Sequence, residues 1–229
     1  MKKELEAAKK KSSPRDLFRI PILRKRICVM SFRRHLLTVS YFGLSLHLQH
    51  LSTNIILLQF LINALAILIS VSGHFVLNHM GRRITQLVLM SLRGIFMLTA
   101  AFVPQEMQIL RIIMATLAGG ISSLCMAVMR LHSNELIPTT LRATGMGVTA
   151  IFGNTGLFLA PLFMMLAIYS AYLPWIVYGG FSILNGFSVL LLPETKNQPL
   201  PDSIHDVGND WKESRQAKKE NSIIKVTRF

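Results

Sequence analysis

Charged residues are nearly absent from the middle of this chain, and this absence constrains the fold more than any other feature of the sequence. No lysine occurs between Ile27 and Pro193, and the only acids in that stretch are Glu106 and Glu135. A water-soluble domain of this size would need far more charge on its surface. Hydrophobic residues make up 51% of the chain and charged residues only 16%. These features predict an all-α membrane protein and exclude a disordered chain, a coiled coil or a disulfide-stapled secreted domain.

Six apolar stretches are each long enough to cross the hydrocarbon layer, which takes about 20 helical residues. They cover Ile27 to Leu48, Asn54 to Leu77, Ile84 to Val103, Ile112 to Leu131, Thr144 to Ile168 and Tyr172 to Leu192. The connections are short, so consecutive helices are expected to run antiparallel. The sequence therefore predicts a six-transmembrane-helix bundle over residues 27–193. A basic juxtamembrane linker is expected at 1–26 and a flexible tail at 194–229.

The net charge of +14 is concentrated at the two ends of the chain and in alternate loops. The segments 1–26, 78–83, 130–142 and 194–229 are basic, whereas the loops near positions 50 and 170 contain no Lys or Arg. Basic segments flank the cytosolic side of membrane helices. Both termini are therefore expected in the cytosol, with contacts to the lipid bilayer. No aromatic–basic interleaving typical of a nucleic-acid module is present, so no nucleic-acid partner is expected.

The last three residues, Thr227-Arg228-Phe229, fit a carboxyl-terminal pattern that PDZ domains bind by strand addition. Such tripeptides also arise often by chance. A PDZ-domain partner and a chance match both stay open.

Several passages of the chain resemble segments of one known transporter family. They are Asp16 to Arg24, Tyr41 to Leu46, Gly81-Arg82-Arg83, Glu135 to Gly147, Pro193-Glu194-Thr195 and Gln198 to Asp202. In this order they resemble the C-terminal half, helices seven to twelve, of a major facilitator superfamily transporter of the organic anion and organic cation solute-carrier family.

The resemblance implies one half of a major facilitator fold and transport of organic anions across the plasma membrane. Such proteins have two six-helix bundles that open a central cavity alternately to each side. No bound cofactor is implied. Family members have twelve spans, so the partner of this chain is expected to be a missing N-terminal six-helix half, with Met1 an internal methionine. The alternative is a truncated product that transports nothing itself and assembles with, or inhibits, a full-length relative.

The resemblance places an ionic cluster at the cytosolic turns, which we interpret as a gate. Its residues are Gly81, Arg82, Arg83, Glu135, Arg142 and Glu194. Ion pairs at a partly dry interface can bias a conformational equilibrium. The arginines could instead merely follow the positive-inside rule, but acids are rare here, which favours the gate. The family's usual aspartate and arginine before Gly81 are Asn78 and His79 in this chain.

The resemblance also implies a set of cavity-lining residues on helices seven, eight and eleven. They are Tyr41, Phe42, Ser45, Ser70, His74, Asn154 and Phe158. Aromatic faces suit flat organic ions, and polar groups would orient a carboxylate or sulfate. Ser70 and Asn154 occupy positions where many anion-handling relatives have a cation. If anions are carried, either other cations compensate or the substrate is a largely apolar conjugate such as a steroid sulfate or glucuronide.

Three arginines inside the predicted spans are candidates for that compensation. An arginine at the bilayer centre raises the free energy of inserting the helix by about 3 kcal/mol, so a functional role is the default hypothesis. Arg33 and Arg34 are expected to reach the cytosolic headgroups with their long side chains. Arg93, near the middle of its span, either faces the bundle interior or is a destabilising departure.

The remaining motifs give no sign of a metal site or an enzyme. His47 and His50, and His74 and His79, are close in sequence, but no Cys, Asp or Glu completes a ligand set. Phosphate-binding loops, zinc-protease motifs and nucleophile elbows are absent from the sequence. The expected protein is therefore a transporter without a metal and not an enzyme.

Overall fold

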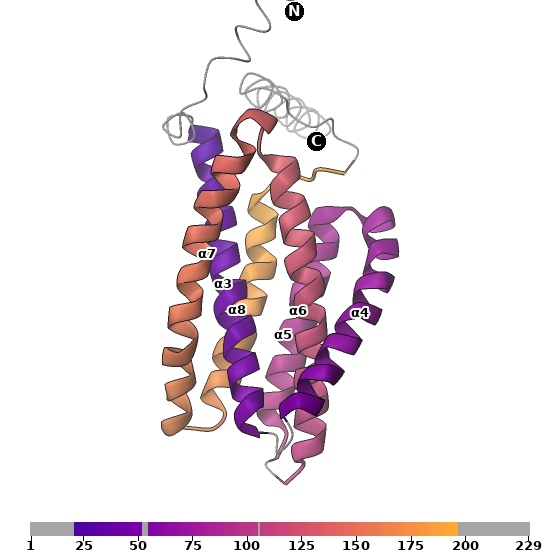
Figure 1. The fold of residues 1–229 in the computed structure, drawn as a ribbon, viewed down its shortest axis with the longest axis vertical. Coiled ribbons are helices and arrows are strands. Elements are labelled where there is room, and N and C mark those ends of the chain that lie inside the picture. The colour runs from indigo at the N-terminus through magenta and orange to yellow at the C-terminus, as the bar shows by residue number, and fades with distance from the viewer. Residues whose placement is uncertain (1–20, 52–54, 105, 197–229) are drawn as a thin grey trace, which may run out of the picture.

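The computed structural model describes residues 21–51, 55–104 and 106–196, which form an all-helical bundle (Figure 1). The helices are α3 (Pro21–Leu51), α4 (Ile55–Met80), α5 (Arg82–Phe102), α6 (Gln108–Leu136), α7 (Arg142–Met164) and α8 (Leu173–Ser188). Short 3-10 turns follow at η1 (Thr139–Leu141), η2 (Met165–Ile168) and η3 (Val189–Leu191). The predicted PDZ motif and most of the predicted linker and tail lie outside the described residues.

The first described helix includes residues that the apolar pattern placed in the linker. α3 starts at Pro21, so residues 21–26, predicted as linker, are part of a helix. Proline suits the first turn of a helix because its missing N–H would have no partner there. α6 runs to Leu136, so the predicted loop from His132 to Ala143 is shorter than expected. Apolar content locates a span, but helices continue into the polar layer beyond it.

Four of these helical segments are long and apolar enough to cross a membrane, whereas six spans were predicted. They are Arg82–Phe102, Gln108–Leu136, Thr139–Ile168 and Leu173–Leu191. α4 contributes a shorter apolar stretch, Gln59–Gly73. α3 is long enough, but its basic residues and histidines lower its apolar character.

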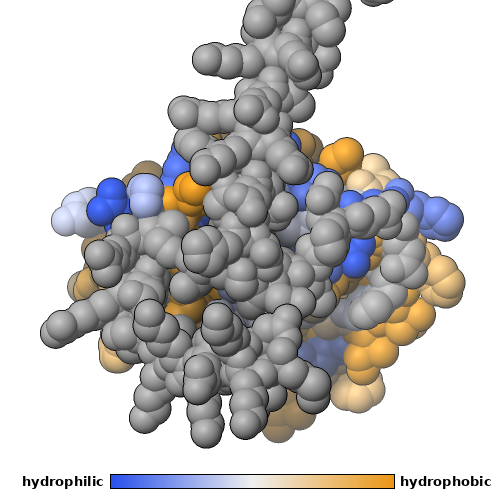
Figure 2. All heavy atoms as spheres, turned by 90° about the horizontal axis from the view of Figure 1, so that it is seen from above, coloured by the Kyte–Doolittle hydropathy of each residue, from blue (hydrophilic) through white to orange (hydrophobic). Residues whose placement is uncertain are grey.

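Consecutive helices run antiparallel, so Pro21 and Lys196 lie at the same end of the bundle, which we call the Pro21 end (Figure 1). α3 packs mainly against α7 and α8, α5 against α6 and α8, and α4 against α6. Seen from the Pro21 end, hydrophobic side chains are visible along several flanks of the bundle and polar ones gather nearer the viewer (Figure 2). An apolar exterior of this kind fits a bundle surrounded by lipid.

The α3–α7 contact depends on small residues of α7. A Cβ added at Gly156 would lie 3.0 Å from the carbonyl oxygen of His35, and one at Gly153 would lie 2.5 Å from Cγ of Arg34. The buried residues of α7 are Gly145, Thr149, Gly153, Gly156 and Ala160. Small residues let two membrane helices approach closely. Gly153 and Gly156 are therefore close-packing points between α3 and α7.

Candidate functional site

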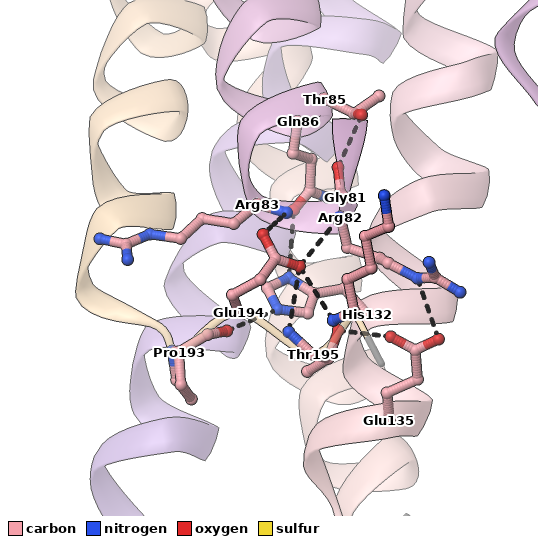
Figure 3. Close-up of polar contacts among 11 residues, drawn as sticks. Gly81, Arg82, Arg83, Thr85, Gln86, His132, Glu135, Pro193, Glu194 and Thr195 are labelled. Atoms are coloured by element: carbon pink, nitrogen blue, oxygen red, sulfur yellow. Dashed lines mark hydrogen bonds and ion pairs between the residues drawn. The ribbon is translucent and has the colours of Figure 1, made fainter. Parts of the chain in front are cut away.

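The carboxylate of Glu194 holds the first turn of α5 at the Pro21 end (Figure 3). The backbone N–H groups of Arg82 and Arg83 donate to its two oxygens, each at 3.0 Å. These are the first two residues of α5, whose N-cap, Gly81, has no side chain to offer. The first N–H groups of a helix lack partners within the helix and favour a negative charge. Glu194 therefore acts as an N-cap supplied from the far end of the chain.

Gly81 has a backbone conformation that makes this cap possible. Its φ is +82° and its ψ is 162°, a combination essentially restricted to glycine. A Cβ at this position would lie 3.2 Å from the carboxyl carbon of Glu194. Gly81 thus gives the turn between α4 and α5 its shape and leaves room for the carboxylate.

Glu135, in the last turn of α6, joins the same group of contacts. Its Oε1 forms an ion pair with Nε of Arg82 at 3.2 Å, and both side chains are largely buried, with 16% and 23% of their surface exposed. Its Oε2 accepts a hydrogen bond from the hydroxyl of Thr195. Glu135 and Glu194 therefore connect α5, α6 and the segment after α8. We call Gly81, Arg82, Arg83, Glu135, Glu194 and Thr195 the Glu194 cluster.

Further contacts fasten the segment after α8 to the bundle. Nη2 of Arg83 donates to the carbonyl of Leu190 at 2.7 Å, and Nζ of Lys196 donates to the carbonyl of His79 at 2.6 Å. Nε2 of His132 lies 3.1 Å from the carbonyl oxygen of Pro193. A carbonyl only accepts, so this ring nitrogen carries the proton.

The environment of Glu194 favours its charged form. Burial by itself raises the pKa of this carboxyl, but the backbone N–H donors of Lys196, Arg83, Arg82 and Thr195 together lower the pKa below its ordinary value. The carboxylate is therefore ionised at neutral pH and complements the positive end of the α5 dipole.

The structure brings together five of the six predicted gate residues: Gly81, Arg82, Arg83, Glu135 and Glu194. Arg142 begins α7 at the same end, but two nitrogens of its guanidinium group are buried without a hydrogen-bond partner among the described residues. No hydrogen bond or ion pair joins Arg142 to the other five among the described residues, and its place in the gate stays a prediction. The contacts found all lie within this one bundle.

Sequence reasoning missed His132, Thr195 and Lys196 as members of this region. His132 lies three residues before Glu135 on α6, so the two share a helix face. Thr195 and Lys196 directly follow Glu194. A search of the residues adjacent to the two rare acids would have found all three.

The predicted cavity residues lie on three helices and stay a prediction. Tyr41, Phe42 and Ser45 are on α3, Ser70 is on α4, and Asn154 and Phe158 are on α7. The side chain of His74 lies outside the described residues. The rings of Tyr41 and Phe42 meet edge to face at 5.3 Å.

Asn154 and Phe158 are exposed, and 79% of the Phe158 surface is accessible. Within the described part of the chain, no hydrogen bond or ring contact joins Tyr41 or Phe42 to these two residues. Phe42 is also exposed, whereas Tyr41 and Ser45 are partly buried.

Arg33 does not reach the headgroups as predicted, because it is buried in the bundle. Only 1% of its surface is exposed, and its Nε donates to Oδ1 of Asn185 on α8 at 3.3 Å. The Asn185 amide in turn donates to the carbonyl of Arg33 at 2.8 Å. This pair of contacts joins α3 to α8.

Arg93 lies fully buried between α5, α6 and α8. Its Nε donates to the hydroxyl of Ser122 at 2.6 Å, and its Nη1 donates to the hydroxyl of Ser182. Of the two alternatives for Arg93, the structure shows the interior position. It faces the inside of this bundle and is bound by neutral hydroxyls.

Among residues 21–51, 55–104 and 106–196, no three His, Cys, Asp or Glu side chains gather where they could hold a metal ion. His47 instead packs its ring edge to face against Trp175 at 4.8 Å.

Comparison with known proteins identifies the family. Residues 28–227 match the Major Facilitator Superfamily. The chain is 76% identical over its whole length to solute carrier family 22 member 27 of Mus musculus, of which it covers 42%. It is 52% identical over its whole length to the steroid transmembrane transporter SLC22A24 of Rattus norvegicus, of which it covers 41%. It is 50% identical over 98% of its length to solute carrier family 22 member 25 of Homo sapiens, of which it covers 41%.

The chain thus spans about two fifths of the length of these relatives. Their names are those of solute carriers and transporters, not of enzymes. The matches confirm the predicted resemblance to the solute carriers, and the share covered agrees with one half of such a protein. The chain belongs to the Major Facilitator Superfamily.

Proposed function

We propose that this chain is one six-helix half of a plasma-membrane transporter that moves organic anions by alternating access, with both termini in the cytosol. Steroid sulfates or glucuronides are the proposed substrates. The proposal is supported by the membrane-compatible bundle, by the family, and by the similarity to a protein named as a steroid transmembrane transporter.

The main observation behind this proposal is the sign of the charged side chains on the described helices. Every charged side chain of the six described helices is basic, with the single exception of Glu135, and Glu135 is paired with Arg82. A surface dominated by one sign of charge attracts solutes of the opposite sign. Such a bundle favours anions over cations.

The Glu194 cluster fits the mechanical part of the proposal. Alternating access in this superfamily is largely a rocking of one rigid half against the other. By joining α5, α6 and the segment after α8, the cluster would keep this half rigid at the proposed cytosolic end. Breaking it would then loosen the half during the transport cycle.

A fusion protein tests the transport activity. The chain is joined to the part of mouse solute carrier family 22 member 27 that it does not cover, and is expressed at the cell surface. We expect saturable uptake of a radiolabelled steroid sulfate and none of a tetraalkylammonium cation. Uptake of the cation, or no uptake by a fusion that reaches the surface, would contradict the proposal.

A second experiment separates the proposal from the alternative of a non-transporting partner. The chain alone is co-expressed with the rat steroid transporter relative. Lowered steroid sulfate uptake by the relative, together with no uptake by the fusion, would favour the non-transporting partner.

The orientation of the chain in the membrane is tested with antibody tags at both termini. These tags should be accessible only in permeabilised cells.

A further inference from the structure

A small cleft opens between α3, α6 and α7. It is lined by Met30, Arg34, Met126, Met129, Arg130, Ser133 and Thr149. α3 packs against both α6 and α7, while α6 and α7 make few contacts with each other. α3 therefore forms the floor of the cleft, and α6 and α7 form its walls.

Two arginines from different helices meet at this cleft without any acid. Arg34 belongs to α3 and Arg130 to α6, and their positive charges repel each other. Neither forms a hydrogen bond or an ion pair in the part of the chain that the structure describes, and no aspartate or glutamate lines the cleft. Two adjacent guanidinium groups without a counter-charge form a site that an anion would stabilise.

The side chain of Arg34 is directed by packing. Its aliphatic part lies over Gly153 of α7, where even a Cβ would come within 2.5 Å of its Cγ. This contact keeps the stem of Arg34 between the helices, and the side chain lines the cleft instead of extending along the bundle surface. Its neighbour Arg33 points in a different direction, toward Asn185 of α8.

The size and the remaining lining of the cleft indicate which part of a ligand it would hold. Its volume is about 30 Å³, close to the space of one water molecule, so it would admit an oxygen atom of a charged group but is far too small for a steroid skeleton. Ser133 adds a hydroxyl donor, whereas the hydroxyl of Thr149 donates to the carbonyl of Met146 at 3.0 Å, and three methionines border the arginines. Methionine side chains adapt to irregular apolar surfaces. They would contact the apolar part of a ligand next to its charged group.

We propose that Arg34 and Arg130 form the anion subsite of this half, binding the sulfate or carboxylate group of an organic conjugate while its apolar body lies outside the cleft. This inference rests on the proposed function for the class of ligand. In this inference Arg34 and Arg130 recognise the negative charge of the ligand, in place of the positions of Ser70 and Asn154, where many anion-handling relatives have a cation.

The test measures equilibrium binding of two probes to the detergent-solubilised fusion described above. One probe is a radiolabelled steroid sulfate and the other is the same steroid with a free hydroxyl. We expect the sulfate to bind more tightly, and Arg34→Gln and Arg130→Gln each to weaken its binding about tenfold, because each removes a charge-assisted hydrogen-bond donor. Binding of the neutral steroid should change little in either variant.

Control variants separate recognition of the anion from damage to the fold. Arg24→Gln removes an exposed charge from the same helix α3 but outside the cleft, and should leave sulfate binding unchanged. The double change of Arg34 and Arg130 to lysine keeps the charge and should retain more binding than the double change to glutamine. Equal sulfate binding by the wild type and the double glutamine variant would overturn the inference, as would a wild type that does not prefer the sulfate.

Uptake measurements on the same proteins distinguish the two proposals. If the wild-type fusion transports the sulfate and the double glutamine variant does so with unchanged KM, the anion subsite is wrong and the transport function stands. If the wild-type fusion binds the sulfate through the two arginines but transports nothing, the subsite stands and the proposed function is wrong.

Discussion

Removing the carboxylate of Glu194 should destabilise the Pro21 end of the bundle. In the variant Glu194→Ala, the N–H groups of Arg82 and Arg83 lose the side-chain acceptor that the structure shows for them. Two hydrogen bonds at about 1 kcal/mol net each, with about 0.5–1 kcal/mol from the helix dipole, give a loss of roughly 2–3 kcal/mol. The ion pair of Arg82 with Glu135 does not replace them, because it uses the guanidinium group and not the backbone.

Thermal unfolding in detergent, followed by size-exclusion chromatography of heated samples, measures this loss. For a domain of this size the apparent Tm should fall by about 5–10 °C. Glu106→Gln is the matched control, since it removes an exposed acid at the opposite end of the bundle and should leave the Tm within about a degree. An unchanged Tm for Glu194→Ala, or an equal fall for the control, would refute the assignment of Glu194 as the cap of α5.

Four further predictions follow from the same contacts. Gly81→Ala should lower the Tm, because its φ of +82° costs an alanine about 1–3 kcal/mol, whereas Gly147→Ala, where a Cβ meets nothing within 4 Å, should not. The pKa of the Glu194 carboxyl is lower in the folded protein than in the unfolded chain, so its stabilisation is complete above its unfolded pKa and is lost as the pH falls through its folded pKa. A series of melting curves from pH 7 to pH 3 should show this loss, and Glu194→Gln should reduce the dependence of the Tm on pH. Glu135→Gln in the fusion protein should reduce uptake at equal surface expression, because the tie from α6 to the segment after α8 is weakened; unchanged uptake would remove Glu135 from the proposed gate. Arg93→Leu should insert at least as well as the wild type and leave sulfate uptake unchanged, because Arg93 is buried within the bundle; a large loss of uptake would show that this arginine contributes to the solute path.

The sequence predicted the helices well where a long apolar run must form a helix in lipid. A long apolar run without charge has few alternatives to a helix in lipid, so the ranges at Ile84, Ile112 and Thr144 agree with α5, α6 and α7 to within a few residues. The start of α3 was missed because nothing in a hydropathy pattern marks where a helix continues through polar residues such as Arg24 and Lys25.

The candidate gate could be predicted in its membership but not in its geometry. Acids are rare in this chain, so Glu135 and Glu194 stood out, and the resemblance linked them to the turn at Gly81. Nothing in the sequence says that Glu194 caps α5 through backbone N–H groups, since the two segments are more than 100 residues apart. Arg142 was placed in the same cluster by the resemblance, and its part in the gate stays a prediction, since no hydrogen bond joins it to the cluster among the described residues.

The amino-acid sequence by itself determined the apolar character of the chain, the approximate ranges of most described helices, their antiparallel order and the excess of positive charge, because each of these depends on composition along the chain. Only the tertiary structure decided where each charge points. Arg33 and Arg34 are neighbours in sequence, but successive residues of a helix face directions about 100° apart. One therefore lies against Asn185 inside the bundle and the other lies beside Arg130 at a cleft, and the helices packed around α3 give the two side chains different surroundings.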